Sequence, residues 1–250
     1  MKKDVLGVKI DDLTMEEALE TVHSWLGEKG KHSIFTPNPE IIVAAQKDIG
    51  YKNILNKPDL SIPDGVGLKL SGKIKNTFAG VDFMEELVKR SQDWAVKVGF
   101  LGGAPGVAEK AAKCLSQKYP GVKIIYAESG GEVDERGNSI EYKVLSIEGT
   151  KQKKASSHYT LYNIPYTDLL FIAFGPPKQE KWIARNLKNL DIKVAMSVGG
   201  SLDYISGKVP RVPVILRNLG LEWLFRLIIQ PWRIKRQLAL LKFLWLLTKS

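Results

Sequence analysis

One arrangement recurs along this chain: a short apolar run, then a glycine-rich turn, then in most cases a segment with helical spacing. It appears at residues 96–115 (VKVGFLGGAPGVAEKAAKCL) and 168–187 (DLLFIAFGPPKQEKWIARNL), and residues 193–207 (KVAMSVGGSLDYISG) end in a polar turn instead. Apolar strands that alternate with helices are typical of a mostly parallel sheet with helices on both faces. Ligands of such folds bind beyond the carboxyl ends of the strands. We therefore expect an α/β, Rossmann-like fold with its glycine-rich turns gathered at one edge.

The N-terminal part carries helix-start signals. Residues 4–10 (DVLGVKI) are expected to form an opening strand. Thr14 and Glu17 have the spacing of a capping box and predict a helix that continues to about Glu28. Asp82 is the expected N-cap of another helix, in the segment VDFMEELVKRSQDWAVK.

The charge is concentrated at the C-terminal end. Of the net charge of +10, residues 211–250 contribute +7, from five arginines and three lysines against Glu222. We therefore expect residues 1–210 to form a catalytic α/β domain and residues 211–250 to form a basic, amphipathic, helical appendage. Within the first part, residues 130–166 read as a polar surface insertion. Its segments VLSIEG and YTLYNI are expected to pair as a hairpin around the basic loop KQKK.

The tail LEWLFRLIIQPWRIKRQLALLKFLWLLTKS interleaves aromatic and basic residues. Lys242 interrupts its apolar run, so we expect no segment that spans a bilayer, but an amphipathic element that lies in the membrane interface. Trp suits the headgroup region, and Lys and Arg suit anionic lipid. The alternative is a helix docked on the domain or on another subunit. The abundance of Leu and Ile argues against nucleic acid as a partner.

Three groups of residues could carry chemistry. Gly102 and Gly103 precede a helix whose N-terminus could hold phosphate, although their spacing matches neither the dinucleotide fingerprint nor a Walker loop, and a tight turn is the alternative. Lys178 and Gln179 begin a second helix, where the neutral amide of Gln179 is hard to explain as structure alone. A third group follows strands: Thr36, Asn38 and, in LSIPDGVG, Asp64. From the residues alone, Asp64 could be turn punctuation or a catalytic base.

A metal site is not expected. The three histidines, His23, His32 and His158, are far apart in sequence, and no D-x-D pair is present. The single cysteine, Cys114, cannot form an internal disulfide and fits a reducing compartment. The start of the chain lacks the features of a signal peptide. We therefore expect no metal and no cofactor.

Together these segments resemble the WecG/TagA/CpsF family of glycosyltransferases (glycosyltransferase family 26), and are most similar to its TagA-type N-acetylmannosaminyltransferases. The segments that carry the resemblance are TPNPEIIVAAQKD, LSIPDGVGL, AGVDFMEEL, FLGGAPGVAEKAA, FGPPKQEKWI, SVGGSLDYISGKVPRVP and GLEWLFRLIIQPWRIKRQ. The resemblance implies an inverting, metal-independent enzyme. Such an enzyme transfers a sugar, typically N-acetylmannosamine, from a UDP donor to undecaprenyl-diphosphate-linked N-acetylglucosamine, in cell-wall or surface polysaccharide synthesis. It also implies a peripheral location at the cytoplasmic face of the cell membrane.

The resemblance also implies roles for individual residues. Asp64 would be the catalytic base that deprotonates the acceptor hydroxyl, and Thr36 and Gln179 would orient donor or acceptor. The remaining residues would bind substrate, and the positive charge of the tail arginines would stabilise a diphosphate of donor or acceptor. These expected substrate-binding residues are Asn38, Gly102, Gly103, Lys178, Gly199, Gly200, Asp203, Arg226, Arg233 and Arg236.

Two departures from the family pattern leave the donor sugar open. Thr77 stands where family members often have arginine, and residues 130–166 form an unfamiliar segment. The close alternative is a family member that transfers another sugar, such as glucuronic acid or glucose, for capsule or exopolysaccharide. A remote alternative is a non-catalytic, membrane-peripheral protein that binds nucleotide sugars. The glycine spacing argues against an NAD-dependent oxidoreductase. The resemblance also permits a homo-oligomer.

Overall fold

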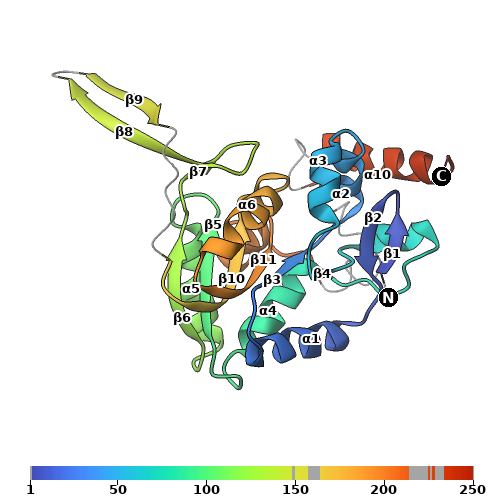
Figure 1. The fold of residues 1–250 in the computed structure, drawn as a ribbon, viewed down its shortest axis with the longest axis horizontal. Coiled ribbons are helices and arrows are strands. Elements are labelled where there is room, and N and C mark those ends of the chain that lie inside the picture. Colours follow the sequence, from blue (N-terminus) through green and yellow to red (C-terminus); the bar gives the residue numbers. More distant parts are fainter. Residues whose placement is uncertain are drawn as a thin grey trace.

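The computed structural model describes residues 2–147, 150–156, 164–213, 225, 227–228 and 234–249, with the backbone alone for residues 140–156 and 234–237. Its centre is a parallel sheet of six strands, which Figure 1 shows between layers of helices. In spatial order the strands are β4 (Leu60–Ser61), β3 (His32–Phe35), β11 (Ile192–Ser197), β10 (Thr167–Ala173), β5 (Lys97–Gly102) and β6 (Lys123–Glu128). The expected α/β, Rossmann-like fold is confirmed.

Each face of the sheet has its own apolar core. Side chains of a strand alternate between faces, and along β10 Leu169 and Phe171 enter one core while Leu170 and Ile172 enter the other. The first core is covered by α1 (Met15–Gly27), α4 (Gly80–Arg90), α5 (Val107–Lys118) and α7 (Ser201–Ile205). The second is covered by α2 (Pro39–Ala45), α3 (Ile49–Leu55), α6 (Lys178–Asn186) and α10 (Ile234–Leu247).

The helix-start signals were right in one case and wrong in another. Thr14 caps α1 in a complete capping box with Glu17, as expected. Asp82, in contrast, lies in the first turn of α4, and the N-cap is Ala79, whose side chain cannot accept a hydrogen bond. The backbone N–H of Gly80 donates instead to Asp64 Oδ1, 3.1 Å away. The carboxylate at the start of this helix therefore comes from Asp64, in another loop, and Asp82 is not the N-cap.

The opening strand is in fact two strands. β1 (Lys2–Val5) and β2 (Val8–Asp11) pair antiparallel, with Val5 opposite Val8. Leu6 and Gly7, which join them, both have positive φ, at 55° and 79°. A two-residue turn with positive φ at both positions matches the right-handed twist of paired strands. Gly7 was therefore a turn signal within the alternating pattern.

The insertion does form a hairpin, but with a different second strand. β8 (Ser139–Ile147) pairs antiparallel with β9 (Thr150–Ser156), and the short β7 (Glu132–Val133) pairs with β8 at its base. The basic KQKK segment lies within β9 instead of forming the loop, because Ile147 is opposite Thr150. Most of the expected partner YTLYNI lies outside the described residues. Figure 1 shows the hairpin extending away from the sheet.

The tail helix α10 is docked on the domain. It packs against α2 and against the 3-10 helix η1 (Val66–Ser71). A second, shorter 3-10 helix, η2 (Leu187–Asn189), follows α6. Phe243 is fully buried in the second core, whereas Leu241 and Trp245 remain 64% and 53% exposed. No helix within the described residues is long and apolar enough to cross a membrane. The docked-helix alternative is thus realised for α10, while part of its apolar surface stays uncovered.

Candidate active site

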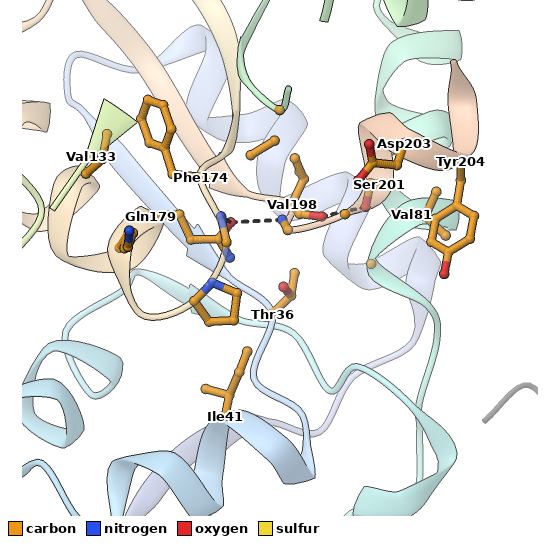
Figure 2. Close-up of a pocket in the computed structure, with 18 of the residues that line it drawn as sticks. Thr36, Ile41, Val81, Val133, Phe174, Gln179, Val198, Ser201, Asp203 and Tyr204 are labelled. Atoms are coloured by element: carbon orange, nitrogen blue, oxygen red, sulfur yellow. Dashed lines mark hydrogen bonds between the residues drawn. The ribbon is translucent and has the colours of Figure 1, made fainter. Parts of the chain in front are cut away.

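A cavity of ≈ 970 Å³ lies at the carboxyl ends of the strands. Loops that follow β3, β4, β5, β10 and β11 form its walls, so the glycine-rich turns do gather at one edge. Figure 2 shows side chains around the hollow, including Thr36 from the loop after β3, Gln179 from α6 and Asp203 from α7. Nine of the expected site residues line it: Thr36, Asn38, Asp64, Gly103, Lys178, Gln179, Gly199, Gly200 and Asp203.

Asp64 is held in place by backbone contacts on both sides. Its own N–H donates to the carbonyl of Pro37 over 3.2 Å, which ties the loop after β4 to the loop after β3. Its carboxylate accepts the N–H of Gly80, at the start of α4. The positive end of that helix favours negative charge beside it. The residue is therefore a fixed carboxylate on the cavity wall and also a structural part of its turn.

Thr36 and Asn38 follow β3 in the TPNPE segment. Thr36 is buried, and its hydroxyl donates to the carbonyl of Ser197, at the end of β11, over 3.3 Å. Asn38 is the N-cap of α2 and accepts the N–H of Ile41 over 3.0 Å. The cap uses one lone pair of the Asn38 amide oxygen, so a ligand contact would use the nitrogen or the second lone pair of the oxygen.

Gln179 connects two neighbouring loops of the cavity wall. Its Oε1 accepts the N–H of Gly175, after β10, over 3.2 Å and the N–H of Gly199, after β11, over 2.9 Å. Its Nε2 donates to Glu180 Oε1 over 2.6 Å. The neighbouring Lys178 forms an ion pair with Glu135, at 3.5 Å, on the segment that leads into the insertion hairpin. Gln179 is therefore an internal brace as well as a lining residue.

The two glycines at the end of β5 and directly after it, Gly102 and Gly103, differ in their surroundings. Gly103 lines the cavity, but its N–H donates to the carbonyl of Ala173 over 3.0 Å and is already used. Gly102 has φ of 114°, and a Cβ there would lie 2.7 Å from the carbonyl carbon of Ala173. Gly102 is not among the described residues that line the cavity, because its backbone packs against β10. The expectation that Gly102 contacts substrate stays a prediction, and the structure shows in addition that its backbone packs against β10.

The described cavity wall is rich in acid. Six acidic side chains and two lysines line it: Glu40, Asp64, Glu132, Asp134, Glu135 and Asp203, with Lys178 and Lys208. Lys208 lies 3.5 Å from the carboxylate of Asp203. A diphosphate placed here would need further positive charge from outside this set of residues.

The tail arginines fall outside what the structure shows. Arg226 and Arg233 lie outside the described residues, and Arg236 belongs to α10 through its backbone alone. Earlier in the sequence, Arg211 pairs with Asp82 and Glu85 of α4. Among the described side chains, no three His, Cys, Asp or Glu residues converge in a way that could hold a metal ion.

Sequence reasoning missed the support behind Gln179. Glu180, in the first turn of α6, is 1% exposed and accepts a hydrogen bond from the Tyr51 hydroxyl over 3.1 Å. Burial raises the pKa of Glu180. Nothing in the local pattern links α3 to α6, so this pair was visible only in three dimensions. The wall formed by residues 131–135 was missed because the insertion was read as peripheral.

Comparisons with known proteins identify the family of this chain. The sequence model of the glycosyl transferase WecG/TagA/CpsF family matches residues 3–250. A Staphylococcus aureus (strain MRSA252) protein named N-acetylglucosaminyldiphosphoundecaprenol N-acetyl-beta-D-mannosaminyltransferase is 31% identical over the whole of this chain and 93% of its own length. Proteins of the same name from strains NCTC 8325 / PS 47 and COL are 29% identical over the same shares. The chain therefore belongs to the WecG/TagA/CpsF family and is a glycosyltransferase.

Proposed function

We propose that this enzyme transfers N-acetylmannosamine from a UDP donor to undecaprenyl-diphosphate-linked N-acetylglucosamine, in the synthesis of a cell-wall or surface polysaccharide. The names of the Staphylococcus aureus relatives support the choice of sugar and acceptor. The observation that carries the proposal is the fixed carboxylate of Asp64 on the wall of a cavity large enough for a nucleotide sugar. It supports the interpretation of Asp64, in the turn LSIPDGVG, as a base.

The proposed reaction is a single in-line displacement. Asp64 takes the proton of the acceptor hydroxyl while that oxygen forms a bond to the anomeric carbon of the donor sugar. The bond between the anomeric carbon and the diphosphate oxygen breaks, and UDP leaves. Attack from the face opposite the leaving group inverts the anomeric centre. Metal independence is part of the proposal, and the assay described below tests it directly.

Thr36 and Gln179 are proposed to orient the reactants. Both lie on the cavity wall, and both are restrained by hydrogen bonds to the end of β11 or to the loop that follows it. Restrained groups lower the entropic cost of holding two reactants in line. Asn38, Gly199, Gly200 and Asp203 would contact the nucleotide sugar, with Lys178 beside them.

The tail would complete the site with positive charge. The acid-rich wall makes a binding site for diphosphate incomplete without added cations, and Arg226, Arg233 and Arg236 are the candidates that the resemblance names. They would contact the diphosphate of the donor or of the acceptor. Because α10 buries Phe243, removal of residues 211–250 would uncover the second core. Single Arg→Gln substitutions are therefore the cleaner test of charge, with an expected loss of transfer and an unchanged melting temperature.

A peripheral position at the cytoplasmic face of the cell membrane fits the lipid-linked acceptor. Leu238, Leu241 and Trp245 are exposed at helical spacing on α10, and Lys249 lies over the Trp245 ring at 3.9 Å from its centroid. Such a combination suits the interface of an anionic bilayer. The same exposed apolar surface would serve a homo-oligomer in the absence of lipid.

The closest alternative is transfer of another sugar, such as glucose or glucuronic acid. Thr77 and the unusual insertion motivate it, since residues that lead into the insertion line the cavity. The acidic side chains of Glu132, Asp134 and Glu135 on that wall would repel the carboxylate of glucuronic acid, which favours a neutral sugar. Membership of a glycosyltransferase family argues against the remote alternative, a non-catalytic binding protein.

The decisive experiment measures UDP release with a short-chain lipid-diphosphate N-acetylglucosamine acceptor. UDP-N-acetylmannosamine, UDP-glucose and UDP-glucuronic acid are offered in parallel, with liposomes and with EDTA. Acceptor-dependent release that is selective for N-acetylmannosamine and unaffected by EDTA is the expected result. Release with another donor would move the enzyme to a different polysaccharide, and loss of activity in EDTA would refute metal independence. An Asp64→Ala variant that binds UDP and keeps near-normal turnover would return Asp64 to a turn role.

A further inference from the structure

Glu180 is a buried acid for which the proposed mechanism has no use. It lies in the first turn of α6 and is 1% exposed, between residues of the second core that include Tyr51 and Trp182. A carboxyl group in apolar surroundings is costly unless its oxygens find donors. Here Oε2 accepts from the Tyr51 hydroxyl at 3.1 Å and Oε1 accepts from Gln179 Nε2 at 2.6 Å. A buried polar group kept at this cost calls for a function.

The bond from Gln179 to Glu180 determines which way the Gln179 amide faces. An amide presents an acceptor at one end and donors at the other, and its orientation follows from its hydrogen-bond partners. With Nε2 directed at Glu180, Oε1 is left for the N–H groups of Gly175 and Gly199. A flipped amide would place its donors against these two N–H donors. Glu180 therefore excludes the orientation in which the brace between the two loops is lost.

The loops that this amide joins are two adjacent parts of the cavity wall. Gly175 follows β10, Gly199 follows β11, and both glycines line the cavity. Both have positive φ, at 76° and 52°. Loops of this kind hold one conformation only when their surroundings restrain them. Figure 2 shows Gln179, from α6, facing the loop that carries Val198 and Ser201.

We propose that Glu180 and Tyr51 are positioning residues: through their hydrogen-bonded chain they orient the Gln179 amide, which fixes the loops after β10 and β11 relative to each other. Neither Glu180 nor Tyr51 is among the residues that line the cavity, so both act through Gln179. Burial raises the pKa of Glu180. The inference rests on the proposed function in so far as this cavity is the transfer site.

Substitutions can separate the effect of the bulk of the Glu180 side chain from the effect of its hydrogen bonds. Glu180→Gln keeps an oxygen that accepts from Gln179 and gains an N–H₂ that can donate to the Tyr51 oxygen. Glu180→Leu has similar bulk but no acceptor for Gln179 Nε2. Tyr51→Phe removes one hydroxyl and leaves the ring in the core. Ser91→Ala is the matched control, because it removes a buried hydrogen bond, from Ser91 Oγ to the carbonyl of Val88, at the far end of α4.

The experiment measures amide hydrogen exchange at Gly175 and Gly199 by NMR, in the full chain and without substrate. Loss of one hydrogen bond should raise local exchange about three- to tenfold. We expect this increase in Glu180→Leu, a smaller increase in the same direction in Tyr51→Phe, and protection close to that of the wild type in Glu180→Gln and Ser91→Ala. In the UDP-release assay, Glu180→Leu should lose at least tenfold in kcat/KM, and Glu180→Gln should stay within about threefold.

Several results would overturn the inference. Exchange at both glycines that is no faster in Glu180→Leu and Tyr51→Phe than in Ser91→Ala would show that the chain does not restrain the loops. If Glu180→Leu fails to fold, Tyr51→Phe decides by the same comparison. Equal loss of kcat/KM in Glu180→Gln and Glu180→Leu would mean that the acid itself is needed. Amide hydrogen exchange is measured without the sugar-transfer reaction. Absence of UDP release in the wild type would therefore count against the proposed function without affecting this test.

Discussion

Phe243 offers the sharpest test of how α10 is attached. Its side chain is fully buried in the second core, against elements that carry the loops of the cavity. A phenyl side chain buries on the order of 150 Å², which at ~25 cal/mol per Å² is about 4 kcal/mol. Phe243→Ala should therefore lower the free energy of unfolding by about 3–5 kcal/mol, the range found for such cavity-forming substitutions.

The assay is urea unfolding followed by tryptophan fluorescence, with Leu241→Ala as the control. Leu241 lies two residues away on the same helix but is 64% exposed, so its truncation should change stability by less than about 0.5 kcal/mol. In co-sedimentation with vesicles that contain anionic lipid, Leu241→Ala should have the larger effect on binding and Phe243→Ala the smaller one. Leu241→Ala should weaken vesicle binding because it removes apolar surface that is free to enter the interface.

The refuting result for this prediction is specific. A loss below 1 kcal/mol in Phe243→Ala, with an unchanged denaturant m-value, would mean that α10 does not contribute to the folded core in solution. Equal vesicle binding by Leu241→Ala and the wild type would show that the exposed face of α10 is not the face that meets lipid. The two outcomes are independent, since one concerns the docked side of the helix and the other its opposite side.

Three further predictions follow from single residues. Asp64→Asn should keep UDP binding and lose at least a hundredfold in kcat, because the amide cannot accept a proton; kcat within tenfold of the wild type would contradict the role of base. Glu180→Gln should gain stability relative to the wild type as pH rises from about 4.5 to 7. The reason is that the raised pKa of Glu180 makes the folded wild type bind a proton that the unfolded chain releases, so the free energy of unfolding of the wild type falls by up to about 1.4 kcal/mol per pH unit. Urea unfolding of both proteins across this pH range measures the difference, and a difference that does not change with pH would refute the prediction. Gly102→Ala should cost about 2 kcal/mol or more, since φ is positive and the added Cβ meets the Ala173 carbonyl, whereas Gly27→Ala, with nothing within 4 Å, should be neutral or stabilising in the same thermal-unfolding experiment.

Periodicity and turn residues were enough to predict the central sheet. Apolar runs followed by glycine-rich turns indicated parallel strands, and the carboxyl-edge rule then placed Thr36, Asp64, Gln179 and Gly199 on one cavity. These signals are local, and the geometry of a parallel sheet converts them into proximity without further information. The capping box at Thr14 was predictable for the same reason, because both partners lie within four residues.

The errors concern interactions between distant segments. Asp82 is not the N-cap because α4 already begins at Gly80, whose N–H donates to Asp64 from another loop. The contact between Glu180, in the first turn of α6, and Tyr51, from α3, has no local signal in the sequence. The pairing of β8 with β9 depends on register, and apolar content alone pointed to a different second strand.

The docking of α10 on α2 and η1 has a consequence for how the enzyme is made. α2 follows the loop that carries Thr36, and η1 follows the turn that carries Asp64, so the last described helix supports the two loops that hold candidate catalytic residues. During synthesis these loops emerge long before α10 does. Domains fold as their segments leave the ribosome, and contacts between distant segments form late. The loops that carry Thr36 and Asp64 therefore gain the packing of α10 only after the chain has been synthesised through residue 247.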